Sequence, residues 1–83
     1  MSTKEQIIIE RLQGAFPDAQ IQLRDTNGGG SHWELHICAK ELDGLSRVKK
    51  HQAIYKPLND MIAANEVHAL QINTYTAEAW EQR

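Results

Sequence analysis

Four histidines and one cysteine are the side chains of this 83-residue sequence best suited to metal ligation or nucleophilic chemistry. Three of them, His32, His36 and Cys38, alternate with apolar residues, a pattern that predicts a β-strand with these side chains on one face. Because a strand advances about 3.3 Å per residue, His32 and His36 would lie roughly 13 Å apart. That separation is too long for one metal ion unless the strand bulges, so solvated side chains on a sheet face are the alternative interpretation.

His68 differs from the other histidines because it precedes an apolar stretch, residues 69–72, that has strand character. Neutral imidazole coordinates iron, zinc and copper well, so His68 is a candidate metal or cluster ligand. The alternative is a histidine that is partly packed at the end of a sheet and hydrogen-bonded to backbone.

Cys38 is the only cysteine, which excludes an internal disulfide in a monomer and zinc frameworks that need two or four cysteines. Nothing in the sequence besides the nearby histidines indicates an activated thiol, and so short a chain offers little room for an oxyanion hole or a substrate cleft. We therefore expect a protein that is not an enzyme.

A basic segment spans residues 47–56, although the nine Lys and Arg residues of the chain are outnumbered by eleven Asp and Glu. The segment contains no acidic residue and carries four cations, Arg47, Lys49, Lys50 and Lys56. At the start of a helix, free backbone N–H groups add to the attraction for anions. The segment is a candidate phosphate-binding surface, with a solvated helix face as the alternative. The net charge of −2 disfavours a protein that coats nucleic acid.

The run Gly28–Gly30 predicts a loop between two strands that pair as a hairpin. It is not a phosphate-binding motif, because it lacks the lysine of that motif and leads into a strand. Its glycines would let the backbone of a partner or a cofactor approach closely, or would serve only as a flexible connection.

Length and composition favour one domain over residues 1–83, because single hydrophobic cores usually occupy about 50–200 residues. Hydrophobic periodicity and capping residues predict helices and strands in the order α-β-β-α-α-β-α. They are a helix at 3–14, strands at 19–24 and 32–39, a helical region at 47–65, a strand at 67–75 and a short helix after Thr76. This order is typical of an α+β sandwich with helices packed against a small sheet.

The helix ends carry recognisable capping residues. Either Ser2 with Glu5 or Thr3 with Gln6 can form a capping box, in which each side chain satisfies a free backbone N–H at the start of the first helix. Ser46 is the expected N-cap of the helical region that begins at position 47.

Pro57 lies inside the helical region and breaks its hydrogen-bond ladder, so the region is either two helices or one kinked helix. The apolar side chains expected on its core face are Val48, Ile54, Leu58, Ile62 and Ala63. In the last strand, alternation places Leu70 on one face and Val67 on the opposite face.

Five stretches of the sequence together resemble the BolA family: GLSRVKKHQ at 44–52, IY at 54–55, VHAL at 67–70, TYT at 74–76, and Trp80. The resemblance runs from the first helix to Trp80 and is strongest to the short bacterial branch of the family. It implies a class II KH-like fold, with a three-stranded sheet and helices packed on one side. The GxxG loop of KH domains is missing, because the segment 43–46 has one glycine.

The resemblance implies a non-enzymatic protein that pairs with a monothiol glutaredoxin to hold a bridging [2Fe–2S] cluster, in iron–sulfur trafficking and the stress response. The ligand histidine of the family corresponds to His68, and His32 matches a second ligand from the loop between the first two strands. The glutaredoxin thiol and glutathione would supply the other ligands, so no cofactor is expected in the isolated protein. Imidazole in place of thiolate makes a cluster less negative and raises its potential.

The alternative function, also implied by the resemblance, is a DNA-binding transcriptional regulator. The segment 46–56 resembles a helix-turn-helix, whose phosphate contacts would be Arg47, Lys49, Lys50 and Lys56. The longest apolar run, Ile7–Ile9, is far shorter than the ~18 residues of a membrane span, and the polar start of the chain is not that of a signal peptide. We therefore expect a cytoplasmic protein without membrane contact, which is a monomer or a weak homodimer when alone.

Overall fold

The computed structural model describes residues 3–26, 28–30, 32–64, 66–67 and 69–83. Its helices and strands are α1 (Lys4–Ala15), β1 (Gln20–Asp25), β2 (His32–Cys38), α2 (Arg47–Tyr55), α3 (Asn59–Ala63), β3 (Ala69–Tyr75) and α4 (Ala77–Glu81). Two short 3-10 turns complete the order: η1 (Lys40–Leu42) precedes α2, and η2 (Lys56–Leu58) joins α2 to α3. The order of helices and strands is the one that the sequence predicts.

The three strands form one sheet in the order β1-β2-β3, so that β2 lies in the centre. The predicted hairpin is present, because β1 and β2 pair antiparallel, starting with Gln20 opposite Cys38. β2 and β3 pair in parallel, starting with His32 beside Ala69. Parallel neighbours need a long crossover connection, which α2 and α3 supply.

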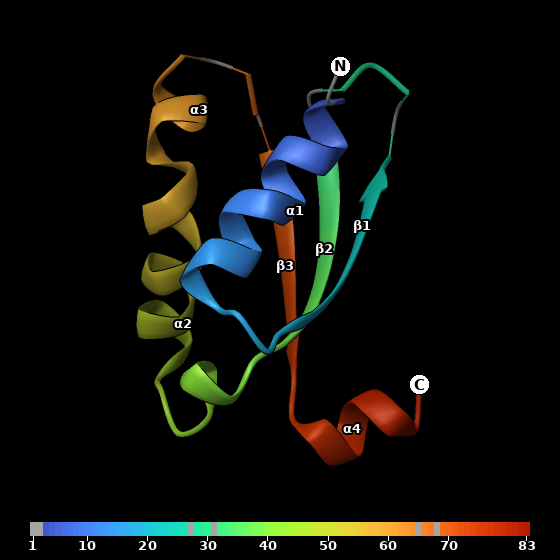
Figure 1. The fold of residues 1–83 in the computed structure, drawn as a ribbon, viewed down its shortest axis with the longest axis vertical. Coiled ribbons are helices and arrows are strands. Elements are labelled where there is room, and N and C mark those ends of the chain that lie inside the picture. The colour runs from blue at the N-terminus through green and yellow to red at the C-terminus, as the bar shows by residue number, and fades with distance from the viewer. Residues whose placement is uncertain (1–2, 27, 31, 65, 68) are drawn as a thin grey trace.

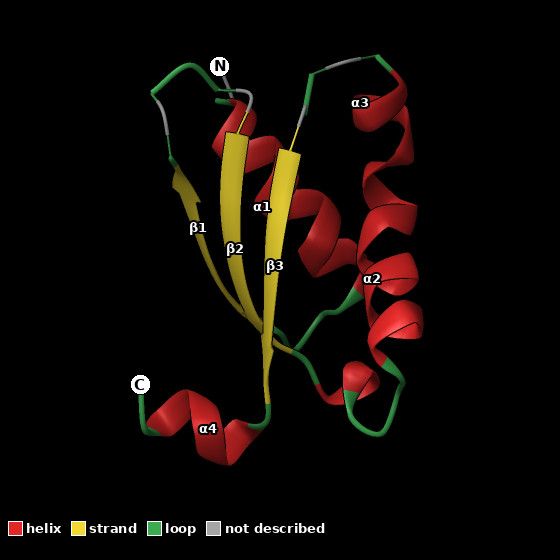
Figure 2. Cartoon of the chain, turned by 180° about the vertical axis from the view of Figure 1, so that it is seen from behind, coloured by secondary structure: helices red, strands yellow, loops and turns green. Residues whose placement is uncertain are grey.

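The helices α1, α2 and α3 gather on one side of the sheet and leave its other face open (Figure 1). Seen from behind, the open face of the strands lies in front of α1, and α2 and α3 run beside β3 (Figure 2). α4 follows the end of β3 and carries the C-terminus. This arrangement confirms the predicted α+β class, with a three-stranded sheet and helices packed on one side. Among the described residues, no helix is long and apolar enough to cross a membrane.

The core lies between the helices and the covered face of the sheet. The central strand contributes Trp33, Leu35 and Ile37, whose side chains are at most 5% exposed. α1 contributes Ile8 and Leu12, which are fully buried. Three more buried side chains come from the α2–α3 segment: Ile54, Leu58 and Met61. Since burying one such side chain stabilises a fold by about 1.5–3 kcal/mol, this layer holds the sheet and helices together.

The helix ends are capped by the residues that the sequence predicts. Thr3 accepts a hydrogen bond from the Gln6 amide at 3.2 Å, and the Gln6 side chain accepts one from the Thr3 amide at 3.0 Å. Of the two predicted capping boxes this one is present, and the other begins at Ser2, outside the described residues. Ser46 and Thr76 cap α2 and α4, each accepting from the amide three residues ahead.

Pro57 divides the helical region into two helices rather than bending one. α2 ends at Tyr55, the 3-10 turn η2 carries Pro57, and α3 begins at Asn59. Proline lacks the amide that an α-helix would need at this position, and the tighter 3-10 turn does without that bond.

Val48 was predicted on the core face of this region, and the structure shows that this prediction is wrong. The Val48 side chain is 65% exposed, whereas Ile54 is fully buried. At 100° per residue, Val48 lies about 120° around the helix from Ile54, so it faces away from the sheet. Ala63 at the end of α3 is likewise exposed, while Ile62 packs against the core.

Val67 was predicted on the strand face opposite to Leu70, but it is 3% exposed and belongs to the core against which Leu70 also packs. β3 begins only at Ala69, so strand alternation does not extend back to Val67. Val67 therefore packs into the core from outside the strand.

Candidate functional site

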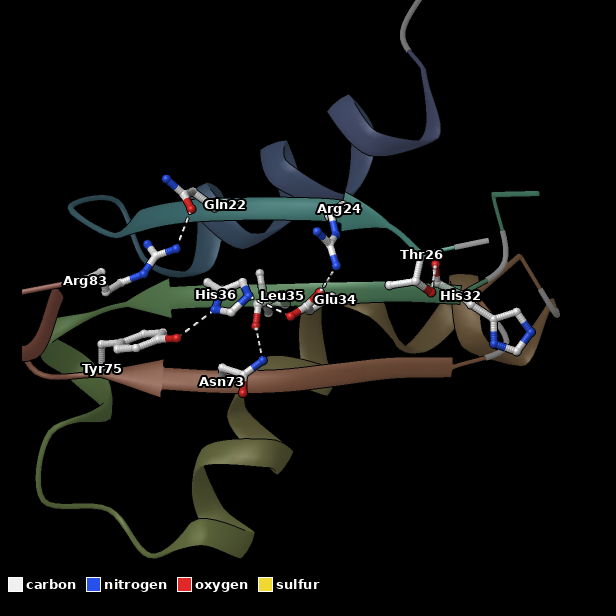
Figure 3. A network of polar contacts seen from close by, with 10 residues as sticks. All are labelled: Gln22, Arg24, Thr26, His32, Glu34, Leu35, His36, Asn73, Tyr75 and Arg83. Carbon is white, nitrogen blue, oxygen red and sulfur yellow. Dashed lines mark hydrogen bonds and ion pairs between the residues drawn. The ribbon is translucent and has the colours of Figure 1, made fainter. Parts of the chain in front are cut away.

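His32 begins β2 at the end of the sheet that carries the glycine loop. Its backbone carbonyl accepts two hydrogen bonds from Thr26, one from the amide at 3.0 Å and one from the hydroxyl at 3.2 Å. Figure 3 shows its imidazole at this end of the strand, beside the start of β3 and apart from the other polar side chains of β2. The residue is exposed. The strand therefore fixes the backbone of His32 and leaves its side chain at the surface.

His68 lies outside the described residues, so its predicted role as a ligand stays a prediction. Both of its chain neighbours are described: Val67 is buried in the core and Ala69 is the first residue of β3. Ala69 is the partner of His32 in the parallel register. The register therefore brings His32 to the residue that directly follows His68.

The glycine loop beside His32 is organised by one side chain. Asp25 accepts hydrogen bonds from the Gly28 amide at 2.9 Å and from the Gly30 amide at 2.8 Å. Both glycines have positive φ angles, of 75° and 77°, which other residues adopt only with strain. The Gly30 carbonyl accepts from the Trp33 indole at 3.0 Å. These hydrogen bonds hold the described part of the loop against the core. The sequence had left a merely flexible connection as one alternative for this loop.

His36 does not share a site with His32 but belongs to a network on the open face of the sheet (Figure 3). Its Nε2 lies 3.0 Å from Glu34 Oε1, and its Nδ1 lies 2.7 Å from the Tyr75 hydroxyl. A carboxylate only accepts, so in the neutral ring Nε2 carries the proton and Nδ1 accepts from Tyr75. Glu34 also pairs with Arg24 at 3.0 Å. Among the described residues, no group of three or more His, Cys, Asp and Glu could hold a metal ion.

Tyr75 is the member of this network that the sequence analysis did not single out. Strand alternation places Glu34 and His36 on one face, but the approach of Tyr75 depends on the register between β2 and β3. Tyr75 also contacts α4, because its ring meets the Trp80 ring edge-on at a centroid distance of 5.6 Å. The Arg83 guanidinium stacks over both rings. The network thus links the sheet face to the C-terminal helix.

Cys38 ends β2, six residues from His32, so the two side chains lie about 20 Å apart along the strand. The thiol is half-buried and reduced, and it lines a cavity of about 390 Å³ with Asp18, Lys40 and Asp43. It is therefore remote from the end of the sheet that carries His32.

The four basic residues predicted to bind phosphate do not gather on one face. Arg47 and Lys50 line a cavity of about 430 Å³ between α2 and β3, together with His51. Lys49 and Lys56 are exposed and lie outside this lining. Residues seven apart share a helix face, so Lys49 and Lys56 form a second stripe that points elsewhere. The segment thus presents two pairs of cations rather than one continuous surface.

Comparison with known proteins places these features in a family. The family model described as BolA-like protein matches residues 5–79. An uncharacterized protein of Acinetobacter guillouiae is 37% identical over 75 residues, which are 90% of this chain and 87% of that protein. Acid stress protein IbaG of Escherichia coli is 44% identical over 54 residues, which are 65% of this chain and 64% of that protein.

Among solved structures, the BolA domain of SufE1 from Arabidopsis thaliana superposes with a TM-score of 0.81 at 26% identity. The match covers 94% of this chain and 96% of that domain. The arrangement of one three-stranded sheet and its helices is therefore shared along nearly the whole chain.

Proposed function

This chain belongs to the BolA family, and from that premise we propose that it pairs with a monothiol glutaredoxin to hold a bridging [2Fe–2S] cluster. In this proposal the chain is a non-enzymatic partner in iron–sulfur trafficking, and glutathione and the glutaredoxin thiol complete the ligand set. The ligands from this chain are His68 and His32. The relative named as an acid stress protein supports a role in the stress response.

The observation that carries the proposal is the register of the parallel strands. His32 pairs with Ala69, the residue after His68, at an exposed end of the sheet. Since His68 directly precedes Ala69 in the chain, this pairing favours a cluster shared by His32 and His68, whereas His32 and His36 are separated along one strand. The donor chemistry fits as well, because imidazole nitrogen replaces thiolate on one iron of Rieske-type [2Fe–2S] centres. Such a cluster supplies redox-active iron at a higher potential than one with four thiolates.

The described residues around His32 are suited to a site that a partner completes. Thr26 holds the His32 carbonyl, so the imidazole starts from a fixed backbone position. Two described positions of the neighbouring loop, Gly28 and Gly30, offer little steric obstruction, and a Cβ at Gly28 would meet nothing within 4 Å. At Gly30 it would meet only the Lys4 ammonium, at 3.8 Å. A partner could therefore approach this end of the sheet closely.

Anaerobic reconstitution tests the proposal directly. The chain is mixed with a monothiol glutaredoxin, iron, sulfide and glutathione, and visible absorption and native mass are recorded. We expect a coloured heterodimer. We expect His68→Ala and His32→Ala each to change the visible spectrum and to accelerate cluster loss, because an imidazole ligand is missing.

Two matched variants control for general effects of substitution. Cys38→Ala removes the only thiol of the chain, at the other end of β2, and His51→Ala removes an imidazole from α2. Both should form the same coloured complex as the unmodified chain. An unchanged spectrum in His68→Ala, with circular dichroism confirming the fold, would contradict the ligand assignment.

The second function, DNA binding, remains a prediction from the basic segment 46–56. Contacts to phosphates make log affinity fall with log salt by about 0.9 for each phosphate neutralised. If Arg47, Lys49, Lys50 and Lys56 all contact phosphate, replacing any one of them by Ala should reduce that slope by about one. Absence of binding to duplex DNA at low salt would contradict this function.

A further inference from the structure

A groove runs between the α2–α3 segment and the free edge of β3, on the side of the molecule away from β1. It consists of two cavities, of about 430 Å³ and about 350 Å³, that follow one another along the strand. Its helical wall is one stripe of residues spaced four, four, four and three apart: Arg47, His51, Tyr55, Asn59 and Ile62. This spacing keeps the side chains on one face of the helical segment as it passes through η2. The view in Figure 2 shows α2 and α3 beside β3 along this length.

The other wall of the groove is the backbone edge of β3. Four successive residues, 72–75, line the first cavity. Since successive side chains of a strand point to opposite faces, a cavity that touches all four must meet the strand at its edge. β3 is the last strand of the sheet, and within the described residues its backbone pairs with β2 and not with α2 or α3. The outward N–H and C=O groups of β3 therefore face this groove, as at any unpaired sheet edge.

The two ends of the groove differ in chemistry. Near Tyr75 the lining includes the cations Arg47 and Lys50 as well as His51, and none of the described residues that line it is acidic. The end near α3 is lined mainly by apolar and uncharged groups, among them Ile62 and Leu70. An occupant that matches both ends carries negative charge at one end and apolar side chains at the other.

We propose that this groove binds an extended segment of a partner protein, acidic at one end and apolar at the other, which adds to β3 as a fourth strand. The seven residues of β3 span about 23 Å, the length of a peptide of about seven residues. Main-chain hydrogen bonds to the strand edge would supply affinity, and the helical wall would select the side chains. The apolar end of the groove is lined by Val67 and Ala69, the chain neighbours of His68, so it adjoins the proposed cluster site, but the inference does not depend on cluster binding.

A polypeptide fits these features better than a nucleic acid does. A nucleic acid backbone has no amide N–H and C=O groups to pair with the edge of β3. Binding of single strands relies on aromatic platforms, whereas the aromatic side chain of the helical wall, Tyr55, is already in edge contact with His51 at 6.4 Å. Lys49 and Lys56, which a phosphate backbone would also attract, lie outside the groove.

Fluorescence anisotropy with three labelled probes tests the proposal on the full chain. The first probe is an eight-residue peptide with four acidic residues followed by four of Val and Thr. The second is the same peptide with N-methyl groups on alternate residues, which block hydrogen bonds to a strand edge. The third is a single-stranded DNA octamer. We expect the first peptide to bind, the N-methylated peptide to bind at least about tenfold more weakly, and the DNA to bind more weakly than the first peptide.

A matched pair of charge reversals locates the binding site on α2. Lys50 lines the groove and Lys49, its chain neighbour, does not. Lys50→Glu should weaken peptide binding by about tenfold or more, while Lys49→Glu should change it by no more than about twofold. Amide exchange of residues 72–75 should slow when the peptide is bound, because the edge becomes paired.

Each alternative result overturns the proposal. Equal affinity of the two peptides would mean that the strand edge is not used. Equal effects of the two lysine substitutions would mean that charge acts over the whole surface. Preference for the DNA octamer would assign the groove to nucleic acid, and no binding of the first peptide would leave the groove without this function. Circular dichroism of both variants confirms that the fold is retained.

Discussion

The side chains on the two faces of the central strand β2 are held by different interactions, although they share one backbone. On the covered face, Trp33, Leu35 and Ile37 are at most 5% exposed and belong to the core. On the open face, Glu34 and His36 retain partial exposure and pair sideways with residues of β1 and β3. Packing orders the first face, and hydrogen bonds between neighbouring strands order the second.

The difference separates the part of the molecule that specifies the fold from the part that is free for chemistry. Side chains of the covered face cannot change without loss of packing, because protein interiors are close-packed. Side chains of the open face are held more weakly, since a hydrogen bond at a wet surface adds little net stability. His32 lies on the open face, so the ligand role proposed for it does not interfere with packing of the core.

A substitution on the covered face should cause the largest loss in the free energy of unfolding. Leu35→Ala removes a fully buried side chain at the centre of the sheet and should lower the free energy of unfolding by about 2–5 kcal/mol. Urea denaturation measures this loss. Gln71→Ala, an exposed position on β3 whose backbone pairs with Glu34, should change stability by no more than about 0.5 kcal/mol. Similar losses in the two variants would remove the distinction between the faces.

Removing a hydrogen bond from the network on the open face should lower the free energy of unfolding by a smaller amount. Tyr75→Phe deletes the hydroxyl that donates to His36 and should reduce the free energy of unfolding by about 0.5–1.5 kcal/mol. His36→Ala combined with Tyr75→Phe forms a double-mutant cycle. We expect a coupling energy of about 0.5 kcal/mol or more, because the two groups are in direct contact. Strictly additive losses would show that the pair contributes nothing to the order of this face.

Substitution of Arg83 should loosen the C-terminal helix α4 locally and should lower the stability of the whole fold only slightly. Within α4 no residue is buried, and Arg83 links it to the open face by stacking on Tyr75 and Trp80 and by donating to Gln22. Arg83→Ala should cost no more than about 1 kcal/mol in global stability but should speed amide exchange in α4. Gln82→Ala serves as the exposed control. Unchanged amide exchange in Arg83→Ala would indicate that the contact between the Tyr75 and Trp80 rings is sufficient to hold α4.

The smallest effect concerns an ion pair between two helices. A hydrogen bond from Arg11 holds the pKa of Asp60 below its ordinary value of 3.8. The ion pair therefore stabilises the fold fully above about pH 5 and loses this contribution as the pH falls through the lowered pKa. Asp60→Asn should slightly reduce the melting temperature at pH 7. The pair is largely exposed, so the change is small.

Melting curves at several pH values check the sign of this effect. The difference between Asp60→Asn and the unmodified chain should shrink as the pH falls through the lowered pKa of Asp60, because the carboxyl group then becomes protonated in both states. A difference that persists at low pH would mean that the carboxylate charge is not its source.

Local sequence signals predicted most of the fold. Alternation in β2, the capping box at Thr3 and the break at Pro57 depend on residues near in the chain, and the structure contains all three. Val48 was misplaced because contacts elsewhere set which side of α2 faces the sheet, and Val67 because β3 begins only at Ala69. An apolar side chain in the first turn of α2 is no guide to which side faces the sheet.

For the candidate site, the sequence by itself determined the chemical types and the face of β2 on which His32 lies. Strand alternation is enough for that, because it is a property of the backbone. Only the tertiary structure decided which strand lies beside His32, that Tyr75 reaches His36, and that Arg47 and Lys50 face the edge of β3 while Lys49 does not. These pairings join residues more than twenty positions apart, and their register is set by the packing of the whole core rather than by any local pattern.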